Sequence, residues 1–363
     1  MLQPKPAVNE IAPCIHGGVD YGELKENGIA LDAVLDFSVS SNPFGPPPGI
    51  REALSTVSIE NYPDSEAGEL KQKLSEKLNV VSGNLLVGHG STELIRLVAI
   101  AYFDSGDKVL IPQPTYGEYE IACRLVSARV FKQPMLKEMN FRLNISETED
   151  LIRQHRPKGI FLCNPNNPTG QYLAKEDFER ILSVAEDSLV VLDEAYVAFT
   201  ENAWKSLDLV DRGNLIIIRS MTKDYALAGL RLGYAIASGS IISSLRRVRP
   251  PWNVNIAAQN AGVVALNNDD YLGESWIKIR EAKDFLVKEL AGLGLSPLPS
   301  QANFFLVEVG DAGKFRQALM KKGILVRDCT SFGLPHHIRL ASRPIGECQK
   351  LIEAIQVVRG YAS

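Results

Sequence analysis

Five short, largely apolar runs between residues 108 and 236 constrain the fold of this chain more than any other feature of its sequence. Apolar runs of this length without regular polar alternation are typical of strands that are buried on both faces. Stretches with helical spacing lie before and between them, for example Thr92–Tyr102. The alternation predicts an α/β fold whose large domain is a mostly parallel sheet covered by helices. The runs are Lys108–Ile111, Gly159–Cys163, Leu189–Leu192, Leu215–Ile218 and Leu232–Ile236.

The chain changes character near residues 50 and 255, which predicts three parts. Residues 1–50 are rich in Pro, Gly and Ser, so we expect an N-terminal arm with turns and no regular helix. Residues 51–255 form the predicted large domain. A long helical pattern then runs from Asn255 to about Leu293, so residues 256–363 are expected to form an interdomain helix and a smaller α+β domain, with which the arm packs. The expected strands of this domain are 303–308, 324–327 and 338–341, and its helices are 312–322 and 345–358.

Composition excludes several classes of protein. The 363 residues include 39 Lys+Arg and 43 Asp+Glu, a net charge of −4 that offers no footprint for nucleic acid or an anionic membrane. No apolar run reaches the 18 or more residues of a membrane-spanning helix. The five Cys are scattered without a CxxC pair, and His336 and His337 would point to opposite faces of a strand. We therefore expect no disulfides and no metal site, and a cytoplasmic protein.

Polar residues follow three of the apolar runs directly. These segments are Asn164–Gly170, Asp193–Tyr196 and Arg219–Lys223. Each has an ordinary structural explanation: a turn, a helix cap or an exposed lysine. Ligands of open α/β sheets bind beyond the carboxyl ends of the strands, however, and here an amide, a carboxylate and an amine converge there. An amine that follows a buried strand can be desolvated, which suits Lys223 to form a Schiff base.

A glycine-containing segment, Gly88–Glu93, precedes the helical stretch Thr92–Tyr102. Glycine lets a ligand approach the backbone, and the free N–H groups of a helix start bind phosphate. The segment lacks the G-x-G-x-x-G and Walker patterns, which disfavours a dehydrogenase or a nucleotide triphosphate enzyme. Ser220, Thr222 and Arg231 could complete a phosphate site. A phosphate site, a reactive lysine and a carboxylate for a pyridinium nitrogen together describe pyridoxal phosphate.

Six motifs together resemble those of fold-type-I pyridoxal-phosphate enzymes of the class I/II aminotransferase superfamily, from His16 to about Arg343. They are GHGSTE, PTYGEY, NPNNPTG, LDEAY, SMTK and GLRLGY. The resemblance implies that Lys223, Asp193 and Tyr196 are catalytic, with Asp193 at the pyridinium nitrogen. It also implies that Asn167 and Tyr196 bind the ring hydroxyl and that Tyr116 stacks on the ring. The implied phosphate ligands are Gly90, Ser91, Thr92, Ser220, Thr222 and Arg231, with Tyr62 of a neighbouring subunit in a homodimer.

The resemblance further implies substrate contacts by Arg339, which would bind a carboxylate, and by His16, Asn42 and Arg343. Two branches of the superfamily are similar. Four features favour L-threonine-O-3-phosphate decarboxylase of cobalamin biosynthesis: the His16 segment, Thr222 before the lysine, Trp252, and the spacing of Arg339 and Arg343. On a strand, residues four apart face the same side, so both arginines could reach one phosphorylated amino acid or amine. The alternative is histidinol-phosphate aminotransferase or a related enzyme that transfers the amino group to 2-oxoglutarate.

The two reactions differ in which bond of the substrate stands perpendicular to the conjugated plane. If the carboxylate does, CO2 leaves; if Cα–H does, Lys223 removes the proton and the amino group is transferred. The sequence leaves this torsion open. A regulator that keeps this fold would need a basic DNA-binding extension, and nothing before residue 83 is long or basic enough for one. The decarboxylase is therefore the first expectation and the aminotransferase the alternative.

Overall fold

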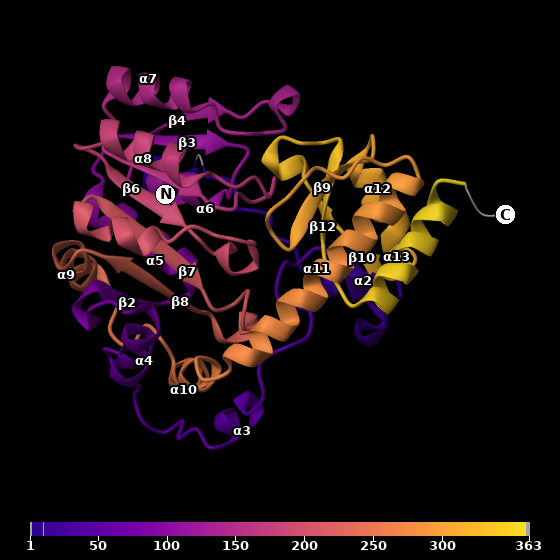
Figure 1. Cartoon of the computed structure of the whole chain (residues 1–363), viewed down its shortest axis with the longest axis horizontal. Coiled ribbons are helices and arrows are strands. Elements are labelled where there is room, and N and C mark those ends of the chain that lie inside the picture. The colour runs from indigo at the N-terminus through magenta and orange to yellow at the C-terminus, as the bar shows by residue number, and fades with distance from the viewer. Residues whose placement is uncertain (1, 10, 361–363) are drawn as a thin grey trace.

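The computed structural model describes residues 2–9 and 11–360, in which a seven-stranded sheet forms the centre of the larger lobe (Figure 1). Six of the seven strands run in one direction, and β8 runs antiparallel to both of its neighbours, β7 and β2. Every residue of β6 and β8 is buried, as the uninterrupted apolar runs predict. The strands in spatial order are β2 (Leu85–His89), β8 (Leu232–Ala237), β7 (Leu215–Ser220), β6 (Leu189–Asp193), β5 (Gly159–Cys163), β3 (Lys108–Gln113) and β4 (Arg129–Pro134).

Helices cover both faces of this sheet, each over its own apolar core. One face packs against α4 (Gly68–Leu78), α7 (Ile145–His155), α8 (Lys175–Val184) and α10 (Ile256–Ala265). The other packs against α5 (Gly90–Tyr102), α6 (Glu118–Leu125) and α9 (Gly239–Val248). The predicted α/β architecture with a mostly parallel sheet is confirmed. No helix of the described residues is long and apolar enough to span a membrane.

The smaller lobe is an antiparallel sheet of three strands with helices on it, in the order β11 (Arg327–Asp328), β12 (His337–Ala341) and β9 (Phe304–Glu308). The 24-residue helix α11 (Asp269–Gly292) runs from the larger lobe to the smaller one in Figure 1. It buries Leu286 and Leu290 in the core of the smaller lobe, together with α12 (Ala312–Met320) and α13 (Ile345–Val358). The expected smaller α+β part is confirmed, whereas domain boundaries at residues 50 and 255 remain our proposal.

Three local expectations were wrong. The expected strand 324–327 divides at Val326: β10 (Ile324–Leu325) pairs in parallel with β1 (Leu35–Asp36), and β11 pairs with β12. The expected helix from 255 to 293 breaks between α10 and α11, where the side chain of Asn268 donates to the carbonyl of Val264. The arm, expected without helix, contains α1 (Pro6–Asn9) and α2 (Tyr21–Glu26), and α3 (Ile50–Ser55) begins at its end. The side chain of Asp20 caps α2, because it accepts hydrogen bonds from the free backbone N–H groups of Gly22 and Glu23.

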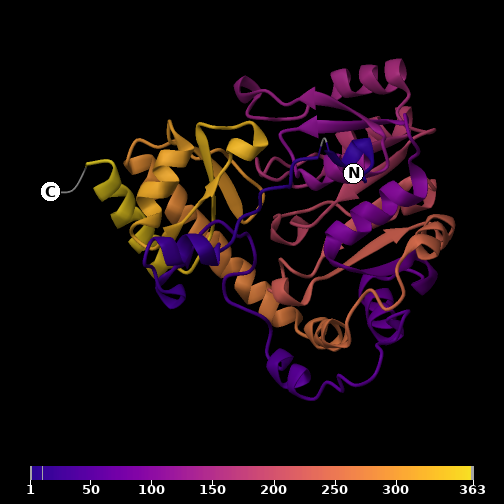
Figure 2. The ribbon, with the colours of Figure 1, turned by 180° about the vertical axis from the view of Figure 1, so that it is seen from behind.

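The N-terminal arm contacts both lobes, and Figure 2 shows its indigo ribbon passing from one to the other. Its helix α1 lies against α6 of the larger lobe. Further along, Leu24 packs on Met320 and Leu325 of the smaller lobe, and Glu23 pairs with Arg316. The arm therefore contacts the smaller lobe through α2 and the larger lobe through α1.

Candidate active site

The carboxyl ends of β5, β6 and β7 meet at one edge of the large sheet, where a cleft opens. Asn167 follows β5, Asp193 ends β6 and Lys223 follows β7, and all three side chains line this cleft. They converge because neighbouring parallel strands end at the same edge of a sheet. The structure thus brings together the amide, the carboxylate and the amine that the sequence places after three separate strands.

Asp193 is a buried carboxylate without an ion-pair partner among the described side chains. Burial raises the pKa of Asp193 to about 6, against the opposing effect of two hydrogen bonds. Tyr119 Oη donates to its Oδ2 at 2.7 Å, and the backbone N–H of Ala195 donates to its Oδ1 at 2.9 Å. Tyr119 is absent from the set of residues predicted from sequence, although its place one helical turn after Tyr116 was a usable signal.

Aromatic side chains enclose the same cleft. The ring of Tyr196 lies 5.7 Å from Lys223 Nζ, and Tyr116 meets Tyr119 edge to face at 5.5 Å. Tyr116 Oη is 3.1 Å from the hydroxyl of Thr92, and burial raises the pKa of Tyr116 above its usual range. A flat ligand would find apolar ring faces in the middle of the cleft and polar groups at its ends.

Hydrogen-bond donors gather where α5 begins, in a second pocket next to the cleft. Lys223 and Tyr116 line both the pocket and the cleft. Gly90 has φ +74°, and a Cβ added there would lie 2.8 Å from Arg231 Nη2, so the guanidinium lies directly over the helix start. Gly233 links this point to β7, because it pairs with Ser220 and approaches the backbone nitrogen of Ser91. Free helical N–H groups with a guanidinium form a phosphate site. The predicted set Gly90, Ser91, Thr92, Ser220, Thr222 and Arg231 therefore lies together and fits the phosphate of pyridoxal phosphate.

Two buried arginines line the cleft on the side of the smaller lobe, Arg327 and Arg339, with no described carboxylate within ion-pair distance. They are directly opposite one another on β11 and β12. Arg339 donates to Asn167 Oδ1 and, at 2.8 Å, to the carbonyl of Ser38, while its buried Nε has no partner. Burial, and next the charge of Arg339, lower the pKa of Arg327. Like charges facing each other across a sheet are destabilising, so this pair indicates a site for an anion.

Arg327 is a second residue that sequence reasoning missed. It lies in a strand of two residues, too short to show a periodic pattern, and its partner Arg339 is twelve residues away. Its guanidinium packs on the ring of Phe332 at 5.1 Å and donates to the carbonyl of Ile15 at 2.6 Å. The signal available in the sequence was a pair of arginines, each within a short apolar run of the C-terminal part.

The arm supplies His16 to the lining of the cleft. Its Nε2 is 3.5 Å from Glu118 Oε1, and its ring centroid is 6.0 Å from that of Tyr116. The segment Cys14–Gly17 lines the same side, so the arm forms one wall of the cleft. Gly17 is required there, because a Cβ would lie 2.4 Å from the carbonyl oxygen of Ser38.

Three predicted residues line neither the cleft nor the adjoining phosphate site of the single chain. Asn42 is buried and uses its side chain on the carbonyl of Asp224 and the N–H of Phe44. Arg343 forms an ion pair with Glu347 and donates to the carbonyl of Asp36. The argument that Arg343 shares a strand face with Arg339 was wrong, since β12 ends at Ala341. Tyr62 is 77% exposed and stacks on Trp252 at 4.3 Å, so its predicted contact needs a second chain.

Residues 32–355 match the family model for aminotransferases of class I and II. A histidinol-phosphate aminotransferase of Moorella thermoacetica is 35% identical over 98% of this chain and 92% of its own. The crystal structure of the histidinol-phosphate aminotransferase from Clostridium acetobutylicum has a TM-score of 0.82 at 28% identity, covering 91% of this chain and 100% of that one. The L-threonine-O-3-phosphate decarboxylase from Porphyromonas gingivalis has a TM-score of 0.78 at 27% identity, with 89% and 99% covered.

These comparisons correct the first functional expectation. Further relatives at 31–36% identity are also named histidinol-phosphate aminotransferase, and the decarboxylase is a more distant structural neighbour. The decarboxylase of cobalamin biosynthesis was therefore the wrong choice, and the position of Arg343 removes one of the four features behind it. The fold, the convergent residues and the family match lead to one conclusion: the chain belongs to the class I and II aminotransferases and is a pyridoxal-phosphate-dependent enzyme.

Proposed function

We propose that this enzyme transfers the amino group of a phosphorylated amine of the histidinol-phosphate type to a 2-oxo acid such as 2-oxoglutarate. The observation that carries the proposal is the pair Arg327 and Arg339, two buried cations of the cleft that have no carboxylate partner among the described residues. Such an amine has a phosphate ester, and the amino acceptor has carboxylates. Both are anions that an arginine pair can bind in turn, and the names of the relatives agree with this substrate class.

Pyridoxal phosphate, when bound, supplies an electron sink for the bonds at the carbon that carries the amino group. Asp193 would hold a proton on the ring nitrogen through its charge. Asn167 would donate from Nδ2 to the ring hydroxyl, because Arg339 occupies its Oδ1. Tyr196 would share that hydroxyl, and Tyr116 would pack on the ring face. Gly90, Ser91, Thr92, Ser220, Thr222 and Arg231 would bind the phosphate.

Lys223 would move the proton that distinguishes transfer from other reactions of the same substrate. Its Nζ would accept the proton from the carbon that bears the amino group. His16, at the mouth of the cleft, would contact the substrate from the arm. Asn42 would position the backbone of Lys223, since the backbone N–H of Asn42 donates to the carbonyl of Lys223 at 2.7 Å.

The decisive experiment supplies the purified holoenzyme with histidinol phosphate and 2-oxoglutarate and measures glutamate. We expect glutamate to form, and to form far more slowly when histidinol without its phosphate replaces the substrate. Equal rates with both amines would contradict a role of the arginine pair in reading the phosphate. Absence of the corresponding amino acid product with every phosphorylated amine and 2-oxo acid tested would end the proposal.

We further propose a cytoplasmic homodimer in which Tyr62 of one chain reaches the phosphate site of the other. Support comes from the exposed aromatic stack of Tyr62 and Trp252 and from Ile59, which is 86% exposed nearby in sequence. The five cysteines, all of them free, suit a reducing compartment. Analytical ultracentrifugation should show a dimer, and Tyr62→Phe should weaken cofactor binding by about 1 kcal/mol. A fully active monomer would refute this arrangement.

A further inference from the structure

The arm carries two metal-ligating side chains to the mouth of the cleft, and neither is used by the proposed mechanism as a metal ligand. Cys14 and His16 are two residues apart in a segment without helix or turn, and both face the first residue of α6, Glu118. The Sγ, imidazole nitrogen and carboxylate oxygen of these three residues all lie within 4.8 Å of one another. His16 Nε2 and Glu118 Oε1 are 3.5 Å apart.

These distances are close to those that a zinc ion requires. Zinc binds sulfur at about 2.3 Å and nitrogen or oxygen at about 2.0–2.2 Å, so its tetrahedral ligand atoms lie about 3.3–3.8 Å apart. The His16–Glu118 pair already has this spacing, and the Sγ of Cys14 needs a shift of about 1 Å at most. The ligand set also suits zinc, which accepts thiolate, imidazole and carboxylate together.

The carboxylate is oriented for this purpose by its surroundings. Glu118 is 5% exposed, and Arg96 Nη2 donates to its Oε2 at 3.1 Å. The other oxygen, Oε1, therefore faces the arm. A hydrogen bond that fixes the outer oxygen of a ligating carboxylate is the usual support around a metal site.

We propose that Cys14, His16 and Glu118 bind a zinc ion at the mouth of the active-site cleft, with water as the fourth ligand. Zinc replaces the proton of the Cys14 thiol, and any proton on His16, and both are released to solvent. No oxidant or reductant is involved. This site departs from the expectation, drawn from scattered Cys and His residues, that the chain holds no metal.

Zinc at this position would inhibit the enzyme. Ile15, between the two arm ligands, accepts a hydrogen bond from Arg327 at its carbonyl. A metal that fixes Cys14 and His16 on α6 holds Ile15 in place, so Arg327 stays occupied and the cleft stays narrow. This consequence rests on the proposed function, since it assumes that Arg327 binds the anionic substrate, whereas metal binding itself does not.

Cobalt(II) is the probe, because its visible d–d bands report tetrahedral geometry and thiolate ligation. We expect the dialysed holoenzyme to bind one equivalent with intense bands that zinc abolishes. Cys14→Ser, His16→Ala and Glu118→Gln should each weaken cobalt binding by at least about 100-fold. Even replacing a residue that only hydrogen-bonds a metal ligand lowers metal affinity by about 10–100-fold. His336→Ala, an exposed histidine away from the cleft, is the matched control and should bind as the wild type does.

Weak octahedral bands only, or equal binding by all four variants, would overturn the site. Kinetics then test the consequence: zinc should inhibit the wild type competitively with the phosphorylated amine and leave Cys14→Ser unaffected. A protein that shows the expected cobalt spectrum but no activity on phosphorylated amines would refute the proposed function and support the metal site.

Discussion

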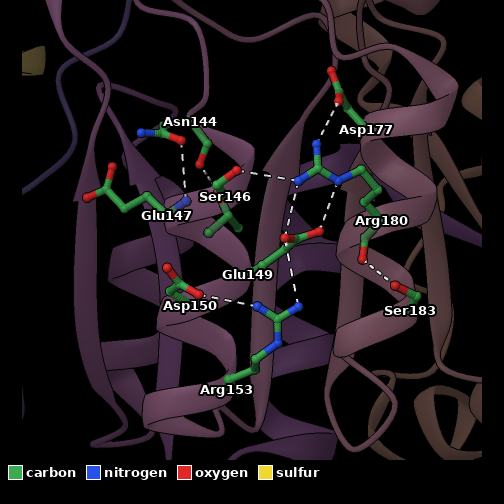
Figure 3. A network of polar contacts seen from close by, with 10 residues as sticks. Asn144, Ser146, Glu147, Glu149, Asp150, Arg153, Asp177, Arg180 and Ser183 are labelled. Carbon is green, nitrogen blue, oxygen red and sulfur yellow. Dashed lines mark hydrogen bonds and ion pairs between the residues drawn. The ribbon is translucent and has the colours of Figure 1, made fainter.

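Arginines serve opposite purposes in two regions of this molecule. On the outer surface, Arg180 of α8 forms two hydrogen bonds with Glu149 of α7, at 3.0 and 3.2 Å, and Arg153 joins the same network (Figure 3). The Arg180 side chain is 48% exposed, and water shares its solvation. In the cleft, Arg327 and Arg339 are 6% and 5% exposed and face each other, with no carboxylate of the described part of the chain in an ion pair with either.

The difference shows which arginines need a ligand. The charge of an exposed arginine next to a carboxylate is already compensated, and such pairs contribute little to stability. A buried arginine without a carboxylate has lost its water and gained only carbonyl, amide and hydroxyl acceptors, which leaves its charge uncompensated. An anion that enters the cleft compensates the positive charge of the two arginines. Asp193 is the acidic counterpart: it is buried, has no ion-pair partner among the described side chains, and suits a ligand with positive charge.

Arg339→Gln is the strongest test of this contrast. Glutamine keeps an amide donor near Asn167 and Ser38 but removes the charge and the paired N–H groups. We expect kcat/KM to fall about 100- to 1000-fold with every anionic substrate, since two charge-assisted hydrogen bonds contribute about 3–4 kcal/mol. The melting temperature should change little, because a costly buried charge is lost together with its hydrogen bonds. Steady-state kinetics and calorimetry measure the two effects. Collapse of the fold with normal kinetics in the remaining protein would contradict an anion-binding role.

Arg327→Gln should sharpen the contrast by separating the two anions. We expect a loss of about 10- to 100-fold in kcat/KM for the phosphorylated amine, equal to one charge-assisted contact of about 1.5–3 kcal/mol. The half-reaction with the 2-oxo acid should lose less, and single-turnover measurements of each half-reaction resolve the two. An equal loss in both would show that Arg327 positions Arg339 and does not read the phosphate.

Tyr119→Phe tests the acidic counterpart. The folded-state pKa of Asp193, about 6, is raised above that of an exposed aspartate, so its carboxylate is charged above this pH and becomes protonated as the pH falls through it. Removing the Tyr119 hydrogen bond, which lowers that pKa, should raise it by about one unit. Pyridoxal-phosphate affinity of the variant should then decline at a higher pH than in the wild type, while both bind alike in alkaline solution. Fluorescence titrations across this range measure the shift, and superimposable pH profiles would exclude the role given to Tyr119.

Arg180→Gln is the smallest expected effect and the control for the whole series. The network of Figure 3 is exposed and screened by solvent, so kcat/KM should remain within twofold of the wild type and the melting temperature should change only slightly. Thermal unfolding in low and high salt checks this. A loss of activity similar to that of Arg327→Gln would mean that arginine replacement harms the enzyme in general, and the contrast between the regions would disappear.

Sequence reasoning succeeded where one element determines the outcome. Lys223 and Asp193 were predicted to converge because each follows a strand whose apolar run is unmistakable, and they do line one cleft. It failed where the outcome depends on pairing between distant segments. Val326 divides an apparent strand because its two halves find different partners, and Arg327 reaches the cleft only through that division.

The hydrogen-bond and ion-pair partners of a side chain cannot be predicted from a sequence pattern either. Arg343 has the right spacing from Arg339 but turns to Glu347, and Asn42 has the right chemistry but donates to Asp224. Tyr119 supports Asp193 through a contact between residues 74 apart in the chain, which no local motif records. The fold class and the convergence of strand-end residues were therefore predictable, whereas the anion site and the supporting contacts depended on tertiary packing.

The hydrogen bonds from Asn42 to the lysine segment also determine when the active site can form during synthesis. Asn42 donates through its backbone to Lys223 and through its side chain to Asp224, 182 residues further along the chain. Closing so long a loop costs entropy that only a nearly complete large sheet can offset. The contact between Asn42 and the lysine segment can therefore form only after the last central strands have been synthesised. A chain that stops before residue 220 lacks both Lys223 and the segment that Asn42 holds, so it cannot form the active site.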